Sequence, residues 1–342
     1  MAAPARTPLN VLFGIPNRSQ RTVGVSPDGR FLRGRKPAPG GVIFIGSVNL
    51  ARHLDPQRFA LERFYLKKGS ARLKFGPGPF LNHIADPDTC SGALEMAALV
   101  VAKVPRPCFN RPAAVARTTR HEVARILTGI ESLIVPKTIR IQNTTPSLVR
   151  DEIARANLVF PILVRGVGMH GGMSLIKADN PGDLEGVADL EPKAEELYVT
   201  EFHDFRSRDG SYRKFRVVVV GGEVFLRHCV IADNWLLHGR RRSSGYDELE
   251  IAMFTRFERE WASQLRPLFR EIATRLGLDF FGVDCNIDDD GRVLLFEANA
   301  CMNILHNYRP SPNKFDAPIA RIKSAVEDVL AAPSTWYSAA IP

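Results

Sequence analysis

The residues whose types and spacing best suit chemistry are carboxylates on two strand-like runs between residues 280 and 299. Both runs are rich in β-branched and aromatic residues. The Asp-Gly pair at 290–291 between them predicts a β-hairpin with a two-residue turn. Counting back along the antiparallel ladder from that turn places Asp284 directly opposite Glu297, on one face of the sheet. The sequence therefore predicts two carboxylates that face each other.

Two facing carboxylates need a neutralising partner, because like charges opposite each other destabilise a strand pair. By the same count Asn299 lies opposite Gly282, whose missing side chain leaves room beside the carboxylates. Carboxylate and amide oxygens suit a hard cation, and the cation that usually bridges substrate phosphates is Mg²⁺. An acidic edge hairpin that faces solvent is the alternative, and a longer turn would shift the pairing.

A glycine-rich segment after an apolar run offers a site of a second kind. Arg165 stands at the end of that run as a counter-charge for an anion. The glycines that follow would let backbone N–H groups close on phosphate oxygens. They are Gly166, Gly168, Gly171 and Gly172. A plain hairpin turn is the alternative interpretation.

A cationic strand face is a third feature. Lys214 and Arg216 lie two residues apart on a predicted strand, so both side chains point to one face while Phe215 points to the other. Such a face can bind an anionic group, although simple solvation of an outer strand explains it equally well. The basic run 240–242 can be interpreted in the same two ways.

Length and composition are those of an ordinary globular protein with two or three domains. The chain has 342 residues, of which 45% are hydrophobic and 24% are charged, and its formal net charge is +9. This charge predicts an anionic partner, such as a nucleotide or an acidic substrate. No zinc-finger spacing or stacking-aromatic box accompanies it, so we expect no nucleic-acid partner.

Two further patterns exclude other classes. No apolar run approaches the roughly 18 residues that span a bilayer, and the first residues lack the apolar core of a signal peptide, so we expect a cytoplasmic protein without a membrane partner. The cysteines are scattered and odd in number, which argues against a disulfide framework and a thiolate zinc site. They are Cys90, Cys108, Cys229, Cys285 and Cys301.

Strand and helix patterns alternate over the first 110 residues, which predicts an α/β unit with a parallel, doubly wound sheet. The later part predicts further strands and amphipathic helices. The main predicted elements are strands at 9–15, 41–47, 58–67 and 135–141, helices at 114–127, 255–276 and 318–330, and a long hairpin turned at Gly221-Gly222.

Taken together, the order of elements resembles the ATP-grasp superfamily, in particular carboxylate-amine ligases of the glutathione synthetase and D-alanine-D-alanine ligase type. The resemblance covers the chain from about residue 80 onward and, more loosely, the N-terminal sheet. It implies an ATP-grasp fold with an N-terminal parallel-sheet domain (1–110), a small ATP-grasp subdomain (111–198) and a C-terminal subdomain (199–342). It also implies a metal site at Asp284, Glu297 and Asn299.

The resemblance also assigns the other parts of a Mg-ATP site. The segment Asn110-Arg111-Pro112 precedes a helix that carries an ATP-binding lysine in the family, and Arg120 stands in its place. The phosphates would meet Arg165, Gly168, His170, Gly171 and Gly172. The adenine hinge would be Thr200, Glu201 and Phe202. Catalytic roles fall to Arg216 and Lys214.

The chain departs from the family pattern at several of these positions. Arginine replaces lysine at 120 and 165, and only the arginine of an Asp-x-Arg pattern is kept at 214–216. The Pro-Gly that often follows Glu-x-Asn is replaced by residues 300–303, Ala-Cys-Met-Asn. Because that segment borders the acceptor site in the family, the sequence predicts the nucleotide site more firmly than the reaction.

The function that the resemblance implies is an ATP- and Mg²⁺-dependent ligase, with Mn²⁺ as an alternative ion. It would activate a carboxylate as an acyl phosphate and join it to an amine. The substrates would be small molecules or peptides with acidic character, and a homodimer is an open alternative. A phosphotransferase on the same fold and a non-catalytic ATP-binding regulatory protein are the other interpretations.

Overall fold

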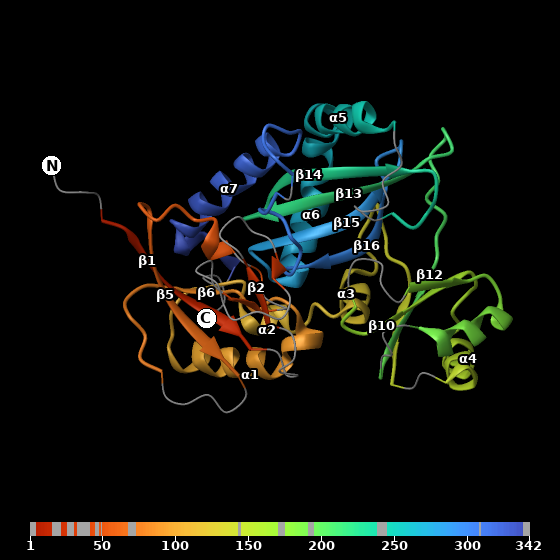
Figure 1. Ribbon diagram of the computed structural model, residues 1–342, viewed down its shortest axis with the longest axis horizontal. Coiled ribbons are helices and arrows are strands. Elements are labelled where there is room, and N and C mark those ends of the chain that lie inside the picture. Colours follow the sequence, from red (N-terminus) through yellow and green to blue (C-terminus); the bar gives the residue numbers. More distant parts are fainter. Residues whose placement is uncertain are drawn as a thin grey trace.

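The computed structural model describes residues 5–15, 22–25, 31–32, 42–44, 48, 50–67, 73–142, 145–169, 175–190, 195–237, 245–307 and 309–337. The strands in these ranges form four β-sheets, and helices pack beside them (Figure 1). No helix among these residues is long and apolar enough to cross a bilayer.

The N-terminal sheet is parallel, as the alternating pattern predicts. Its four strands follow the order β5-β1-β6-β7. The central strand β1 is buried over most of its length, which is typical of a parallel strand covered on both faces. The elements of this part are β1 (Thr7–Gly14), η1 (Leu50–Arg52), β5 (Phe59–Leu66), β6 (Phe80–Asn82), α1 (Pro87–Lys103) and β7 (Cys108–Phe109).

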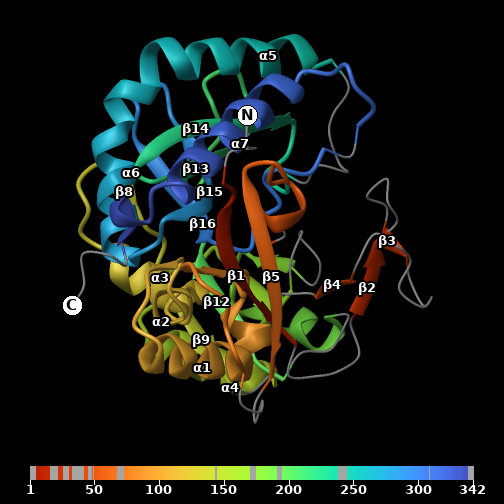
Figure 2. The ribbon, with the colours of Figure 1, turned by 90° about the vertical axis from the view of Figure 1, so that its left-hand side faces the viewer.

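One predicted strand joins a different sheet. The run at 41–47 forms β4 (Val42–Phe44), which pairs antiparallel with β2 (Thr22–Val25). With β3 (Phe31–Leu32) these strands form a separate sheet, set apart from β1 and β5 in Figure 2. The expectation that 41–47 belongs to the parallel sheet was wrong, because a strand pattern does not specify which partner the strand will take.

A predicted helix is interrupted. The pattern at 114–127 forms α2 (Pro112–Val115) and α3 (Arg120–Leu127) instead of one helix. Between them the hydroxyl of Thr118 donates to the carbonyl of Val115 at 2.7 Å, and Thr119 takes an extended conformation before α3. Threonine side chains that bond to nearby backbone groups compete with helix continuation. The break makes Arg120 the first residue of α3.

The small sheet is antiparallel, in the order β11-β10-β12-β9. Along β10 buried and half-buried residues alternate, so one face of the strand packs inward. The predicted boundary between the small and C-terminal subdomains, after residue 198, lies inside β12 of this sheet. The division of the chain into three domains remains a proposal. The elements are β9 (Thr138–Ile141), α4 (Pro146–Arg155), β10 (Ile162–Gly166), β11 (Leu175–Ala178), η2 (Pro181–Asp189) and β12 (Leu197–Glu201).

The large sheet has five strands, in the order β14-β13-β15-β16-β8. As predicted, the long hairpin turns at Gly221 and Gly222, which both have positive φ, and the long helix ends at Gly277 in the left-handed conformation. The elements are β8 (Leu133–Ile134), β13 (Tyr212–Val220), β14 (Glu223–Ala232), α5 (Asp247–Arg256), the π-turn η3 (Phe257–Trp261), α6 (Ala262–Leu276), β15 (Phe280–Ile287), β16 (Val293–Asn299), α7 (Asp316–Leu330) and η4 (Pro333–Thr335).

The acidic hairpin β15–β16 has a longer turn than predicted. The N–H of Asp288 donates to the carbonyl of Arg292 at 3.0 Å, so three residues, 289–291, form the loop, and Gly291 has a φ of +81°. A register shift between Asp284 and the next residue on β15 compensates. It corresponds to one extra residue on β16, which is the definition of a β-bulge. The prediction of a two-residue turn was therefore wrong, although the predicted pairs survive.

The described residues form two large apolar clusters and a small third one, which consists of Tyr212, Val230, Ala232 and Leu237. One cluster runs from the N-terminal sheet into the large sheet and its helices, and it includes Phe109, Phe215 and Trp336. The rings of Phe109 and Trp336 pack edge to face at 5.3 Å. The small sheet has a cluster of its own with α4 and η2, centred on Val149, Val164 and Val199 and outside the larger one.

Candidate active site

A row of charged side chains crosses three strands of the large sheet. Arg216 on β13 pairs with Asp284 on β15, and Asp284 pairs with Glu297 on β16, as the residue count predicts. Two parallel bonds join Arg216 to the Asp284 carboxylate, Nε to Oδ1 at 2.7 Å and Nη2 to Oδ2 at 2.9 Å. The ammonium of Lys214 lies 3.5 Å from the same carboxylate. Both predicted cations therefore face this row.

The cations keep the Asp284 carboxylate ionised although it is buried. Burial raises its pKa, but the charges of Arg216 and Lys214 outweigh burial and hold the pKa well below the usual range. Arg216 also donates to the carbonyl of Asn303 at 3.2 Å. The segment after β16 is thus fixed to the same guanidinium.

Glu297 and Asn299 form the second half of the site. Arg120 Nη2 lies 2.5 Å from Glu297 Oε2, and the amide of Asn299 donates to Glu297 Oε1. Burial lowers the pKa of Arg120, but Glu297 reverses this and the net pKa is raised. The N–H of Cys301 donates to Asn299 Oδ1 at 2.9 Å, which fixes the amide.

The donor set fits a hard divalent cation. Asp284 and Glu297 face each other on neighbouring strands with the Asn299 amide beside Glu297, and carboxylate and amide oxygens are the ligands that a hard divalent cation prefers. One prediction about this region was wrong. The space above Gly282 is filled, because a Cβ placed there would lie 2.5 Å from the sulfur of Met302.

Arg165 is a cation whose charge is incompletely balanced. Its Nε is buried and has no hydrogen-bond partner among the residues that the structure describes. Burial and the nearby charge of Arg120 lower the pKa of Arg165 to about 9, with Glu297 acting in the opposite direction. Two arginines beside one carboxylate leave a net positive charge, which favours binding of an anion.

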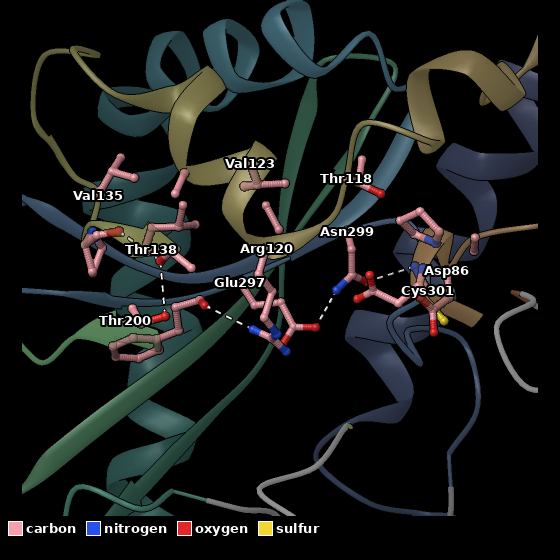
Figure 3. A pocket seen from close by; sticks show the side chains of 18 residues that line it. Asp86, Thr118, Arg120, Val123, Val135, Thr138, Thr200, Glu297, Asn299 and Cys301 are labelled. Atoms are coloured by element: carbon pink, nitrogen blue, oxygen red, sulfur yellow. Dashed lines mark hydrogen bonds and ion pairs between the residues drawn. The ribbon is translucent and has the colours of Figure 1, made fainter. Parts of the chain in front are cut away.

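A cleft lies beside these groups (Figure 3). It holds about 630 Å³ of space, open solvent included. Arg120, Glu297 and Asn299 line one part of it. Another part is lined by the apolar or hydroxyl side chains of Val123, Val135, Thr138, Thr200 and Leu295. The cleft therefore offers a flat apolar compartment next to a charged one, which suits a molecule with an aromatic ring and an anionic tail.

Of the predicted hinge residues, Thr200 is the one among the residues that line this cleft. The hydroxyls of Thr138 and Thr200 bond at 3.1 Å, and Thr200 lines the cleft. The N–H groups of Glu201 and Phe202 donate to the carbonyls of Lys137 and Pro161, at 3.0 and 2.9 Å. Both N–H groups are therefore already hydrogen-bonded to the protein's own backbone. Lys177 lies 4.8 Å from the centre of the Phe202 ring.

Sequence comparisons give no relatives, since no family model and no curated protein matches the chain. Solved structures do match. The D-Ala:D-Ser ligase VanG of Enterococcus faecalis has a TM-score of 0.54 at 13% identity, over 96% of this chain and 99% of its own. D-alanyl-alanine synthetase A from Vibrio cholerae has a TM-score of 0.54 at 12% identity, over 95% and 99%. The D-alanine-D-alanine ligase of Coxiella burnetii has a TM-score of 0.52 at 12%, over 95% and 96%.

The chain has the ATP-grasp fold. This confirms the fold class that the order of strands and helices predicts. In this ATP-grasp chain the cleft lies where α1, α3, the small sheet and the large sheet meet. Of the residues predicted for metal and phosphate binding, Arg120 from α3 and Glu297 and Asn299 from β16 line it, whereas Arg165 on β10 is not among its lining residues.

The glycine loop of the ATP-grasp fold is described only in part. Gly168 has a φ of +74°, and a Cβ there would lie 3.4 Å from the side chain of Thr89 on α1. This positive φ is a conformation that glycine adopts without strain. The predicted phosphate-site residues His170, Gly171 and Gly172, and the basic run 240–242, lie outside the described residues.

Sequence reasoning missed an acidic group on the opposite side of the cleft. Asp86 and Asp88 line the cleft at the start of α1. Asp86 is the N-cap of this helix, and its side chain accepts the N–H of Asp88 at 2.9 Å. The motif Asp-Pro-Asp-Thr is a helix-start signal, but nothing in it indicates a position beside a cleft.

Proposed function

We propose that the protein is an ATP- and Mg²⁺-dependent ligase that activates a carboxylate as an acyl phosphate and joins it to an amine. The supporting observation is the cleft lined by Arg120, Glu297 and Asn299, with Asp284 paired to Glu297 on the neighbouring strand and Arg165 close to Arg120 and Glu297. The fold supports the same proposal, since the structures that share it include a D-Ala:D-Ser ligase and D-alanine-D-alanine ligases.

The nucleotide would lie along the cleft. Its purine would enter the apolar compartment beside Thr200, with Glu201 and Phe202 as the hinge, and its phosphates would meet Arg120, Arg165 and the glycine loop. Asp284, Glu297 and Asn299 would hold Mg²⁺, or Mn²⁺ in its place. A bound metal ion would neutralise phosphate charge and so lower the cost of phosphoryl transfer.

Arg216 and Lys214 would stabilise the substrate as the reaction proceeds. Both cations already neutralise Asp284, which keeps them extended from β13 on the face of the sheet that carries the acidic row. A cation held in place before the substrate arrives needs no reorganisation to stabilise the negative charge of an acyl phosphate. The protein's main contribution would be positioning and charge stabilisation.

We further propose that the substrates are small molecules or peptides with acidic groups. The net charge of +9 supports this class, because a positive field raises the local concentration of anionic substrates.

The test is ADP release from Mg-ATP with pools of carboxylates, with and without hydroxylamine, which traps an acyl phosphate as a hydroxamate. We expect hydroxamate in at least one pool, and its loss by a factor of at least about 100 in Glu297→Gln. Glu223→Gln is the matched control, since Glu223 is an exposed carboxylate at the start of β14 that pairs with arginines of α6. ADP release with a phosphorylated hydroxyl product and no hydroxamate would contradict the ligase and favour a kinase.

A further inference from the structure

The small sheet is a separate body in the fold. Its apolar cluster, with Val149, Val164 and Val199, shares no member with the cluster that joins the N-terminal and large sheets. In Figure 1 it stands on the right with α4, beside α3 and away from β1. Parts with separate cores and polar contacts between them move relative to one another by default.

A polar contact joins this body to the N-terminal part. The hydroxyl of Tyr198, on β12, lies 2.8 and 2.9 Å from the two carboxylate oxygens of Asp88, in the first turn of α1. Arg140, on β9, donates to the same carboxylate at 3.2 Å and also pairs with Glu196. We call Asp88, Tyr198 and Arg140 the latch.

The latch lies in one row with the phosphate-site arginine. Across the small sheet Arg165 pairs with Tyr198, and Tyr198 pairs with Arg140. Residues directly opposite each other in an antiparallel sheet lie on the same face. The face of the small sheet that contacts Asp88 is therefore the face that carries Arg165.

We propose that Asp88 is a positioning residue that holds the small sheet closed against α1 and thereby places Arg165 at the cleft. Asp88 itself lines the cleft, and Gly168 meets Thr89 one residue further along α1. Closure at this point brings the strand of Arg165 and the start of the glycine loop to the wall of the cleft that Asp88 lines. The effect on nucleotide binding rests on the proposed function, whereas the closure does not.

The latch is suited to opening as well as closing. Burial and the neighbouring charge of Asp86 raise the pKa of Asp88, although Tyr198 and Arg140 act in the opposite direction. Burying this carboxylate therefore costs free energy that the latch contacts recover only in part. Opening would return the carboxylate to water.

Closure can be measured directly by electron–electron distance measurements between two spin labels. The labels are placed at Glu95→Cys on α1 and Asp151→Cys on α4, which are both exposed, in the full-length chain. Four of the native cysteines are buried, and the half-buried Cys301 is replaced by serine in every sample. The latch variants are Tyr198→Phe, which removes one hydroxyl, and Asp88→Asn. The control is Tyr246→Phe, which removes a tyrosine–aspartate bond to Asp233 between the start of α5 and the end of β14.

In the parent chain we expect one short distance. Both latch variants should add a population at longer distance, and Tyr246→Phe should add none. Calorimetry with Mg-ADP should show about tenfold weaker binding in the latch variants, the factor that loss of one charge-assisted bond gives.

Unchanged distances in both latch variants would show that the contacts of Asp88 do not hold the small sheet closed. A longer distance with unchanged Mg-ADP affinity would overturn the positioning of Arg165. Absence of Mg-ADP binding in the parent chain would contradict the proposed function, while the distances would still decide whether Asp88 holds the small sheet closed.

Discussion

At the scale of single residues, two of the site's arginines are paired with carboxylates and a third is not fully hydrogen-bonded within the described part of the chain. Arg216 is neutralised by Asp284, and Arg120 by Glu297, whereas the Nε of Arg165 is buried without a partner among the described residues. Even with its pKa lowered to about 9, the Arg165 guanidinium stays protonated at neutral pH and keeps this cost. Burying this charge should cost stability, which is what the proposed phosphate site would require.

Replacing Arg165 with methionine, which has a similar length and no charge, should separate stability from binding. We expect the free energy of unfolding to rise by about 1 kcal/mol, because a poorly compensated buried charge is removed. Affinity for Mg-ADP should fall at least about tenfold. Urea unfolding and calorimetry measure the two effects, with the exposed Arg155→Met as the control. A less stable variant with unchanged affinity would refute this account of Arg165.

At the scale of elements, the acidic row depends on a local compensation within one hairpin. The three-residue loop at 289–291 offsets the pairing by one residue, and the register shift beside Asp284 restores it. The pairing of Asp284 with Glu297 could be predicted because strand alternation is local and the turn is visible in the sequence. The exact turn could not, since Asp-Gly suits both two- and three-residue loops.

Other element-level features depend on contacts that no local pattern encodes. The strand at 41–47 was predicted, but its partner β2 was not, because pairing is a tertiary choice. The latch joins Asp88 to Tyr198 across 110 positions, and neither residue carries a distinctive motif. Arg120 was predicted only through a family resemblance, since the break between α2 and α3 that positions it arises from Thr118.

At the scale of the whole molecule, Asp279 ties three distant parts of the chain together. Its buried carboxylate accepts the N–H groups of Asn110, at the end of the N-terminal part, and of Tyr337, near the C-terminus, at 2.8 and 2.6 Å. The side chain of Asn110 bonds in turn to the backbone at the start of β15. This joint fixes the N-terminal and large sheets as one body.

The same carboxylate should make stability depend on pH. Burial raises the pKa of Asp279 to about 6 from an ordinary value of 3.8, although its hydrogen bonds lower it. The folded state therefore binds this proton more tightly than the unfolded state. Below about pH 4 this group therefore contributes about 3 kcal/mol to the free energy of unfolding, and the contribution is lost as the pH rises through about 6.

Asp279→Asn removes this titration. Between pH 4 and 7 the free energy of unfolding of the parent chain should fall by up to about 3 kcal/mol relative to that of the variant. Urea unfolding across this range measures it, with the exposed Asp151→Asn as the control. A difference that stays constant with pH would show that Asp279 does not titrate here.

The central claim is that the cleft between the small and large sheets binds a nucleotide with Mg²⁺ at Asp284, Glu297 and Asn299. Calorimetric titration with ADP, with and without Mg²⁺, tests it most directly. We expect one site per chain, binding that is at least about tenfold tighter with Mg²⁺, and loss of that Mg²⁺ dependence in Glu297→Gln. Absence of binding at millimolar ADP, or a Glu297→Gln titration identical to that of the parent chain, would contradict the claim.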